Sequence, residues 1–233
     1  MTGSEKKVAG IIQARMSSRR LPGKVMMDLS GKTLLSRVID RTRAAKRIDS
    51  ICVATSAFPE DDVIEIEARR NDVEVFRGDL DNVLMRYCGA ADYMGADYVL
   101  RITGDNPLTE PSFIDMCSDK ILNEDLDYVF VSDVPYGSGA EAISRRALFE
   151  ALAKADSKEK EHVTMYLYKN PEDFKNSTIE PPPWLRRPDI RLTIDTPKDY
   201  IFLRKVFSYF YEKGISNIGL RAVIELIDEI GGA

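Results

Sequence analysis

The chain has 233 residues, of which 44% are hydrophobic and 30% charged, and its formal net charge is −5 at pH 7. This composition is typical of a folded globular protein, and one domain spanning residues 1–233 can bury a substantial core. The acidic balance argues against nucleic acid or an anionic membrane as a partner, because both are bound mainly through excess positive charge. No uncharged stretch approaches the roughly 20 residues that span a bilayer, and the segment MTGSEKKVAG lacks an apolar signal region, so a cytoplasmic location is expected.

Short β-branched segments alternate with helical patterns along the first half of the chain. Strands are expected at residues 8–12, 50–56, 73–76, 97–103 and 127–133, and helix starts at Thr33, Pro59 and Asp79. This alternation predicts βαβ units and a mostly parallel sheet covered by helices, which is an α/β fold. Ligands bind beyond the carboxyl ends of such strands, so chemistry is expected after Ala14, Thr55, Phe76 and Thr103.

The second half of the chain is less regular. It contains a glycine-rich loop at 136–140, helical patterns at 145–155 and 161–170, a strand pattern at 190–195, and two C-terminal helices at about 197–230. The first of these two helices is rich in aromatic side chains, among them Phe202, Phe207, Tyr209, Phe210 and Tyr211. That is more aromatic surface than one helix face hides, so two interpretations stay open, core packing and a subunit interface that would make the protein a homodimer.

A basic loop follows the first predicted strand. Between residues 6 and 27 there are six Lys or Arg and no Asp or Glu, and the loop at 13–24 also holds the small residues Ser17, Ser18 and Gly23. Backbone N–H groups and cationic side chains in such a loop are typical of a triphosphate site, although a solvated basic loop is the alternative. The loop matches neither GxxxxGK[ST] nor GxGxxG, since Ser18 and Val25 replace two required residues of the first motif.

Two aspartates stand at the ends of predicted strands, as a triphosphate site with Mg²⁺ or Mn²⁺ requires. Asp105 follows the strand at 97–103, and Asp195 ends the segment at 190–195. Structural alternatives are a turn ahead of Pro107 for Asp105 and a helix N-cap for Asp195. The DLD sequence at 79–81 is a competing metal motif, for which helix capping is the favoured interpretation. His162, the single histidine, is by itself more typical of a structural hydrogen bond than of catalysis.

Four segments together resemble a known family. QARMSSRRLPGK resembles the nucleotide-binding loop of CMP-sugar synthetases, above all the ARxxSxRLPGK pattern of CMP-KDO synthetase, the enzyme for 3-deoxy-manno-octulosonate. With RITGDNPL, EHVTMYLYKNPEDF and RLTIDTPKDY in that order, the chain resembles the spore-coat-polysaccharide branch of the cytidylyltransferase family from about residue 7 to 205. The resemblance implies a nucleotide-diphospho-sugar transferase fold, GT-A-like and Rossmannoid, built as a three-layer α/β/α sandwich with a mostly parallel sheet.

The resemblance also implies roles for individual residues. Catalytic roles would belong to Arg15, Lys24 and Asp105. The nucleotide would contact Gln13, Ala14, Arg15, Ser17, Ser18, Lys24, Thr55, Ser56, Thr103 and Gly104. The substrate would contact Arg77, Asn106, Glu141 and His162. The metal ion, Mg²⁺ or Mn²⁺, would be held by Asp105 and Asp195.

The chain departs from its branch where the acceptor would bind. Gly139 stands where the branch commonly has Asp in GLDVE, Met165 replaces the proline that follows EHVT, and TGDNP replaces the QGDEP of the KDO enzymes. The acceptor is therefore expected to differ from the usual one.

The expected activity is transfer of CMP from CTP to a sugar acid or related anionic acceptor, with release of pyrophosphate, for surface polysaccharide or glycan biosynthesis. Two alternatives stay open, namely a glycosyltransferase that uses residues 79–81 as its metal motif and a non-catalytic nucleotide-sugar-binding protein.

Overall fold

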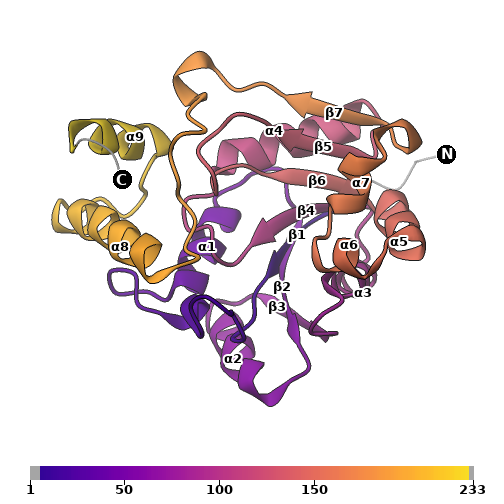
Figure 1. The fold of residues 1–233 in the computed structure, drawn as a ribbon, viewed down its shortest axis with the longest axis horizontal. Coiled ribbons are helices and arrows are strands. Elements are labelled where there is room, and N and C mark those ends of the chain that lie inside the picture. The colour runs from indigo at the N-terminus through magenta and orange to yellow at the C-terminus, as the bar shows by residue number, and fades with distance from the viewer. Residues whose placement is uncertain (1–5, 231–233) are drawn as a thin grey trace.

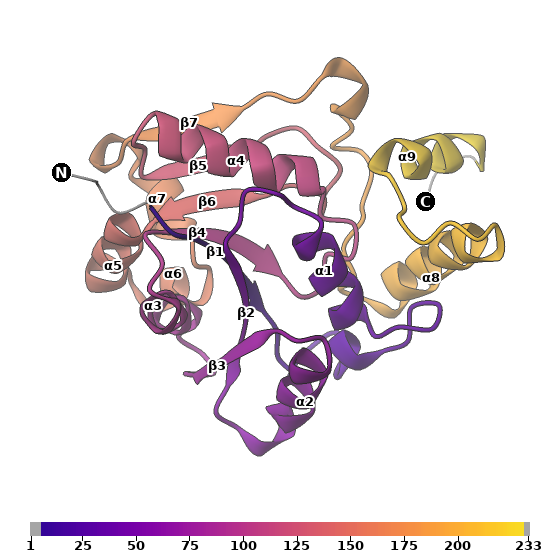
Figure 2. The ribbon, with the colours of Figure 1, turned by 180° about the vertical axis from the view of Figure 1, so that it is seen from behind.

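The computed structural model describes residues 6–230 and shows a seven-stranded sheet with helices on both faces (Figures 1 and 2). In spatial order the strands are β3 (Glu74–Gly78), β2 (Ser50–Ser56), β1 (Val8–Gln13), β4 (Tyr98–Thr103), β6 (Glu141–Ser144), β5 (Tyr128–Val131) and β7 (Asn176–Ile179). All neighbours pair in parallel except β6, which is antiparallel to β4 and β5. The predicted α/β fold with a mostly parallel sheet is confirmed.

Two hydrophobic clusters, one on each face, make the fold a three-layer sandwich. The strands alternate between them, so that Val8 and Ile12 of β1 face one cluster and Ala9 and Ile11 the other. The first cluster is covered by α1 (Leu34–Arg43), α2 (Asp62–Arg70), α4 (Pro111–Asn123), α8 (Pro197–Glu212) and α9 (Leu220–Glu229). The second is covered by α3 (Val83–Met94), α5 (Arg145–Lys154) and α7 (Met165–Lys169), with α6 (Ser157–Glu161) beside them.

Local capping chemistry decides where the helices begin. Thr33 caps α1 as predicted, because its side chain accepts the N–H of Ser36. The predicted start at Asp79 is wrong by three residues, since Asn82 is the cap of α3, which begins at Val83. Asp79 instead accepts the N–H groups of Asp81 and Asn82 in the preceding turn. At Pro59 the chain first forms a short 3-10 turn, Pro59–Asp61, which leads into α2.

The second half of the chain differs from the prediction in three places. The helical pattern at 161–170 is broken around His162 into α6 and α7. The short strands β6 and β7 were not predicted, because neither EAIS nor NSTI has the length or the run of β-branched residues that marks a strand.

The segment 190–195 was predicted as a strand but forms only an isolated bridge between Arg191 and Tyr136. Its alternating Ile190, Leu192 and Ile194 are buried, so the period of two reflects an extended segment packed on the core without a continuous ladder.

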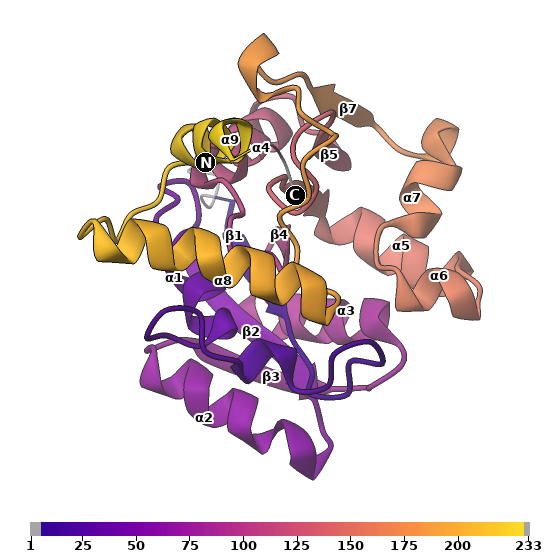
Figure 3. The ribbon, with the colours of Figure 1, turned by 60° about the vertical axis from the view of Figure 1, so that its left-hand side comes forward.

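Helix α8 lies alongside α1 (Figure 3). Most of its aromatic side chains pack against the core. Phe207 and Phe210 are buried, Phe202 and Tyr209 pack partly against the same cluster, and Tyr211 stays 66% exposed. The homodimer remains a prediction. No helix within residues 6–230 is long and apolar enough to cross a membrane.

Candidate active site

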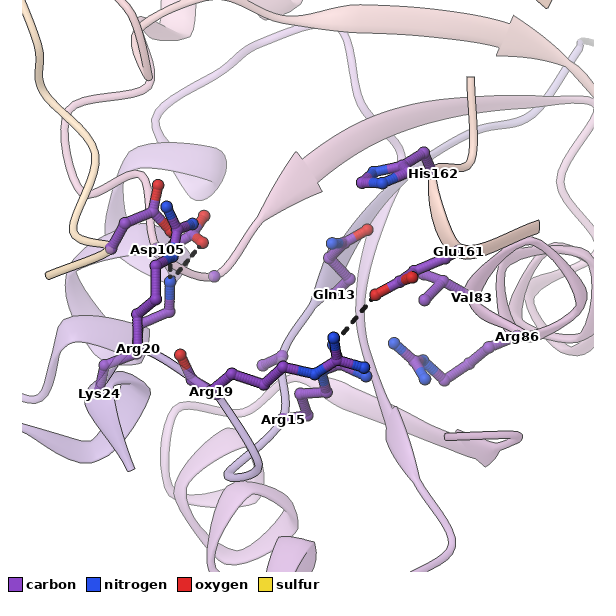
Figure 4. A pocket seen from close by; sticks show the side chains of 14 residues that line it. Gln13, Arg15, Arg19, Arg20, Lys24, Val83, Arg86, Asp105, Glu161 and His162 are labelled. Atoms are coloured by element: carbon purple, nitrogen blue, oxygen red, sulfur yellow. Dashed lines mark hydrogen bonds and ion pairs between the residues drawn. The ribbon is translucent and has the colours of Figure 1, made fainter. Parts of the chain in front are cut away.

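A cavity of about 310 Å³, here called the first cavity, opens at the carboxyl ends of β1 and β4 (Figure 4). Predicted site residues that line it are Gln13, Ala14, Arg15, Ser18, Lys24, Gly104, Asp105, His162 and Asp195. They come from the basic loop, the turn after β4, the α6–α7 connection and the segment before α8. The structure thus brings together residues from four distant parts of the chain, as expected for the ligand edge of such a sheet.

Lys24 is buried at one end of this cavity between the two predicted metal ligands. Its Nζ donates to Asp105 Oδ2 at 2.7 Å, to Asp195 Oδ1 at 3.1 Å and to the carbonyl oxygen of Ile194 at 2.7 Å. The side chain reaches this point because Gly23 adopts a left-handed φ of 70°, which turns the basic loop into a 3-10 helix beginning at Lys24. An ammonium 7% exposed is tolerated here because each of its donors has a partner.

Asp195 is surrounded by cations. Besides Lys24 it pairs with Arg20 at 2.8 Å and with Arg191 at 2.6 Å. Burial alone would raise the pKa of this carboxyl, but the hydrogen bonds and charges of Lys24 and Arg191 outweigh it and hold the pKa below its ordinary value. Asp195 is not the helix cap considered from the sequence, because Thr196 caps α8 in a reciprocal capping box with Asp199.

The two carboxylates fit a divalent cation. Asp105 and Asp195 contact the same nitrogen, so their oxygens converge on one point. Mg²⁺ commonly takes one or two protein carboxylates and completes its shell with water and substrate phosphate. Residues 6–230 contain no group of three or more His, Cys, Asp or Glu arranged to hold a metal, so the remaining ligands would be oxygens of other kinds, such as those of water and substrate phosphate.

Gly104 holds the two halves of this site together. Its N–H donates to the carbonyl oxygen of Gln13 at 2.8 Å, and a Cβ at this position would lie 2.8 Å from that same oxygen. Only glycine allows this approach. The turn that carries Asp105 is therefore fixed directly beside the start of the basic loop.

The opposite end of the first cavity holds arginines with few partners (Figure 4). Arg86 of α3 is 2% exposed, donates only to the carbonyl oxygens of Asp79 and Leu80, and leaves its Nε without a partner among the described residues. Arg15 lies 3.8 Å from Glu161, a weak ion pair. Sequence reasoning missed Arg86, although a charged residue between the buried Leu84 and Tyr87 is a signal that could have revealed it.

Several predicted residues lie outside the first cavity. Thr55 and Ser56 are buried, and both hydroxyls donate to Asp61. Ser17 does not line the cavity, and its buried Oγ has no partner among the described residues.

Arg77 is occupied by ion pairs. It contacts Asp62 at 2.6 Å and Glu65 at 3.0 Å, and the hydrogen bond that it donates to Asp62 raises the pKa of its guanidinium. Its predicted contact with substrate would require these pairs to be broken.

A second cavity of about 300 Å³ lies on the other side of the turn after β4. It is lined by the predicted residues Thr103, Asn106 and Glu141, and also by Arg101, Asp133, Tyr136 and Gly139. Glu141 accepts hydrogen bonds from Arg101 and from Tyr128, each at 2.8 Å. The Nε of Arg101 and the Oγ1 of Thr103 are buried without partners among the described residues, so both can serve a ligand.

Gly139 lines the second cavity and has room for a Cβ. A Cβ added there would come no closer than 3.4 Å to Val134, which is ordinary contact. The backbone therefore does not require glycine at this position. Its small size leaves room where the branch commonly has an aspartate.

Comparisons with known proteins show the family of the chain. The family model described as cytidylyltransferase matches residues 9–223. The spore coat polysaccharide biosynthesis protein SpsF of Bacillus subtilis is 32% identical over 84% of this chain and 85% of its own length. An uncharacterised protein of Methanocaldococcus jannaschii is 38% identical over 96% of this chain and 91% of its own.

Solved structures extend the comparison. A cytidylyltransferase from Leptospira borgpetersenii superposes with a TM-score of 0.89 at 31% identity, covering 97% of this chain and 96% of its own. A CMP-KDO synthetase solved with CTP gives a TM-score of 0.67 at 18% identity over 89% and 100% of the two chains, which supports the fold. The chain therefore belongs to the cytidylyltransferase family, in the branch that includes SpsF.

Proposed function

We propose that the protein transfers CMP from CTP to a hydroxyl of a sugar acid or related anionic acceptor and releases pyrophosphate, in the synthesis of a surface polysaccharide or another glycan. The observation that carries this proposal is Lys24, held between Asp105 and Asp195 beside a basic loop. Two names among the similar proteins point the same way, since one relative is named for spore coat polysaccharide and one solved synthetase was complexed with CTP. A cytoplasmic location belongs to the same proposal.

In the proposed reaction the acceptor oxygen attacks the α-phosphorus of CTP in line. A new P–O bond forms, the acceptor hydroxyl loses its proton to solvent water, the bond from the α-phosphorus to the oxygen shared with the β-phosphate breaks, and pyrophosphate leaves with that electron pair. The protein positions the two reactants and stabilises the charge that develops on the phosphate oxygens. Arg15, Arg20 and Lys24 lie where they can do this, because all three line the first cavity.

Asp105 and Asp195 would hold Mg²⁺ or Mn²⁺, which when bound would neutralise phosphate charge as a Lewis acid. The chain itself contributes a fixed cation at the same point, the Lys24 ammonium. Since both carboxylates already contact Lys24, their side chains are oriented toward the phosphate site before any ligand arrives.

The acceptor would occupy the second cavity. Gly104 and Asp105 line the first cavity, whereas the residues on either side of them, Thr103 and Asn106, line the second. The two cavities therefore meet at this turn, and the acceptor hydroxyl would extend past it to reach the α-phosphate. The unpartnered Arg101 Nε and Thr103 Oγ1 are suited to bind acceptor oxygens.

The test begins with thermal stability in CTP, UTP, ATP or GTP, each with and without Mg²⁺. CTP at about 100 times its dissociation constant should add roughly 2.7 kcal/mol and raise the melting temperature by several degrees. A panel of sugar acids is then screened for pyrophosphate release from CTP. Release of free nucleotide from a sugar nucleotide, with no stabilisation by CTP, would instead support the glycosyltransferase alternative.

A further inference from the structure

Asp61 is a fully buried carboxylate outside the first cavity, and its partners are unusual. It ends the 3-10 turn that leads into α2 and is 0% exposed. Among the described residues, its hydrogen-bond donors are two backbone N–H groups and two hydroxyls, with no Lys or Arg among them. Burying a carboxylate without a cation is unfavourable, so such a group persists where its hydrogen bonds hold a specific arrangement.

The two oxygens of Asp61 hold two separate segments. Oδ1 accepts the backbone N–H of Met16, in the basic loop, at 2.7 Å. Oδ2 accepts the Thr55 hydroxyl at 3.0 Å and the N–H and hydroxyl of Ser56 at 3.1 and 2.5 Å, at the end of β2. Asp61 thereby connects the basic loop to the carboxyl end of β2 through hydrogen bonds.

Met16 links Asp61 to the rest of the basic loop through hydrogen bonds. While its N–H donates to Asp61, its carbonyl oxygen accepts the N–H of Ser18 at 2.8 Å and of Gly23 at 2.9 Å. Gly23 in turn sets the left-handed turn that delivers Lys24 to Asp105 and Asp195. Two hydrogen bonds and one step along the chain therefore connect Asp61 to Lys24, the cation at the phosphate site.

We infer that Asp61 is the positioning residue of the nucleotide-binding loop, and that Thr55 and Ser56 act through it and do not touch the nucleotide. The nucleotide part of this inference rests on the proposed function. The loop geometry does not, because all of its hydrogen bonds lie within the chain.

Hydrogen exchange of the protein without ligand tests the geometry. In Asp61→Ala the amides of residues 14–24 should exchange at least about tenfold faster, because Met16 loses its acceptor, while β1 keeps its protection. Asp62→Asn is the matched control, since Asp62 is the next residue, is 57% exposed and pairs with Arg77. Unchanged exchange in residues 14–24 of Asp61→Ala would overturn the inference.

Calorimetry with CTP tests the consequence for binding. The dissociation constant should rise roughly 10- to 100-fold in Asp61→Ala at unchanged stoichiometry, because a misplaced loop weakens every phosphate contact. A merely structural role would lower the fraction of binding-competent protein and leave the dissociation constant of that fraction unchanged. Asp61→Asn should restore part of the affinity, because its amide oxygen can still accept from Met16 and its amino group can donate to the hydroxyls, although that amino group cannot accept the N–H of Ser56.

Two further outcomes are decisive. Where Asp61→Ala does not fold, Thr55→Val takes its place, because it removes one of the hydrogen bonds that hold the Asp61 carboxylate, and unchanged exchange in residues 14–24 of that variant would overturn the inference. If the wild-type protein binds no CTP, the proposed function fails, while the exchange comparison still decides whether Asp61 positions the loop.

Discussion

The first cavity has two cationic ends that differ in how their charge is compensated. At one end Lys24 lies between Asp105 and Asp195, while at the other Arg86 is buried with only backbone carbonyl oxygens as partners. A cation with hydrogen-bonded carboxylates is held in place before the ligand arrives. Arg86 feels the charges of Asp61 and Asp79 but donates to no carboxylate, so only a bound anion would give it a charged hydrogen-bond partner. One site therefore contains both a cation that is paired before the ligand binds and a cation that the ligand itself would pair.

The largest effect is expected at the paired end. Asp105→Asn should lower turnover by roughly 100- to 1000-fold, because the metal loses a charged ligand where negative charge develops. Binding of CTP without metal should survive, since the amide oxygen still accepts the hydrogen bond from Lys24. Pyrophosphate release and calorimetry measure the two quantities. The control is Asp81→Asn, and a loss of rate there, with Asp105→Asn active, would assign the metal to residues 79–81.

Lys24→Met should remove the cation that compensates the charges of Asp105 and Asp195. Without the ammonium two partly buried carboxylates face each other, so the protein should lose about 3 kcal/mol of unfolding free energy. The same change should tighten binding of Mg²⁺ alone, because no protein cation competes for the oxygens. Denaturant unfolding and metal calorimetry without nucleotide measure these effects, and weaker Mg²⁺ binding in the variant would contradict the expectation.

In Arg86→Met we expect the opposite result, a small effect on stability and a larger effect on CTP binding. Removing a buried cation that lacks a carboxylate should change stability by no more than about 1 kcal/mol, yet CTP should bind about tenfold more weakly. Arg70→Met, at the exposed end of α2, is the matched control. Equal CTP affinity in Arg86→Met and wild type would show that the unpaired end does not hold the nucleotide.

The smallest effect is expected for Glu161→Gln. Its long ion pair with Arg15 is partly exposed and contributes little, so the change should tighten CTP binding by no more than about fivefold. The gain should shrink at high salt, because exposed charges are screened. Titrations at low and high ionic strength test this, and weaker binding at low salt would contradict it.

The sequence was most informative where local patterns decide the structure. The first five predicted strands exist because β-branched runs and turn residues act locally, and Asp105 and Asp195 could be singled out because each ends an extended segment. Arg86 and Asp61 were missed because their importance lies in burial and in partners distant in sequence, which no local pattern reveals. For the same reason Thr55 and Ser56 were expected at the nucleotide, whereas their hydroxyls donate to Asp61.

The contact of Lys24 with Asp195 joins positions that are 171 residues apart. Contacts of such sequence separation form late, because the intervening chain must first be ordered. During synthesis the basic loop leaves the ribosome early. Its partner Asp195 becomes available only after most of the chain has been made. The proposed nucleotide site can therefore form only when folding is nearly complete. A truncated chain lacking residue 195 should keep much of the sheet and fail to assemble the site.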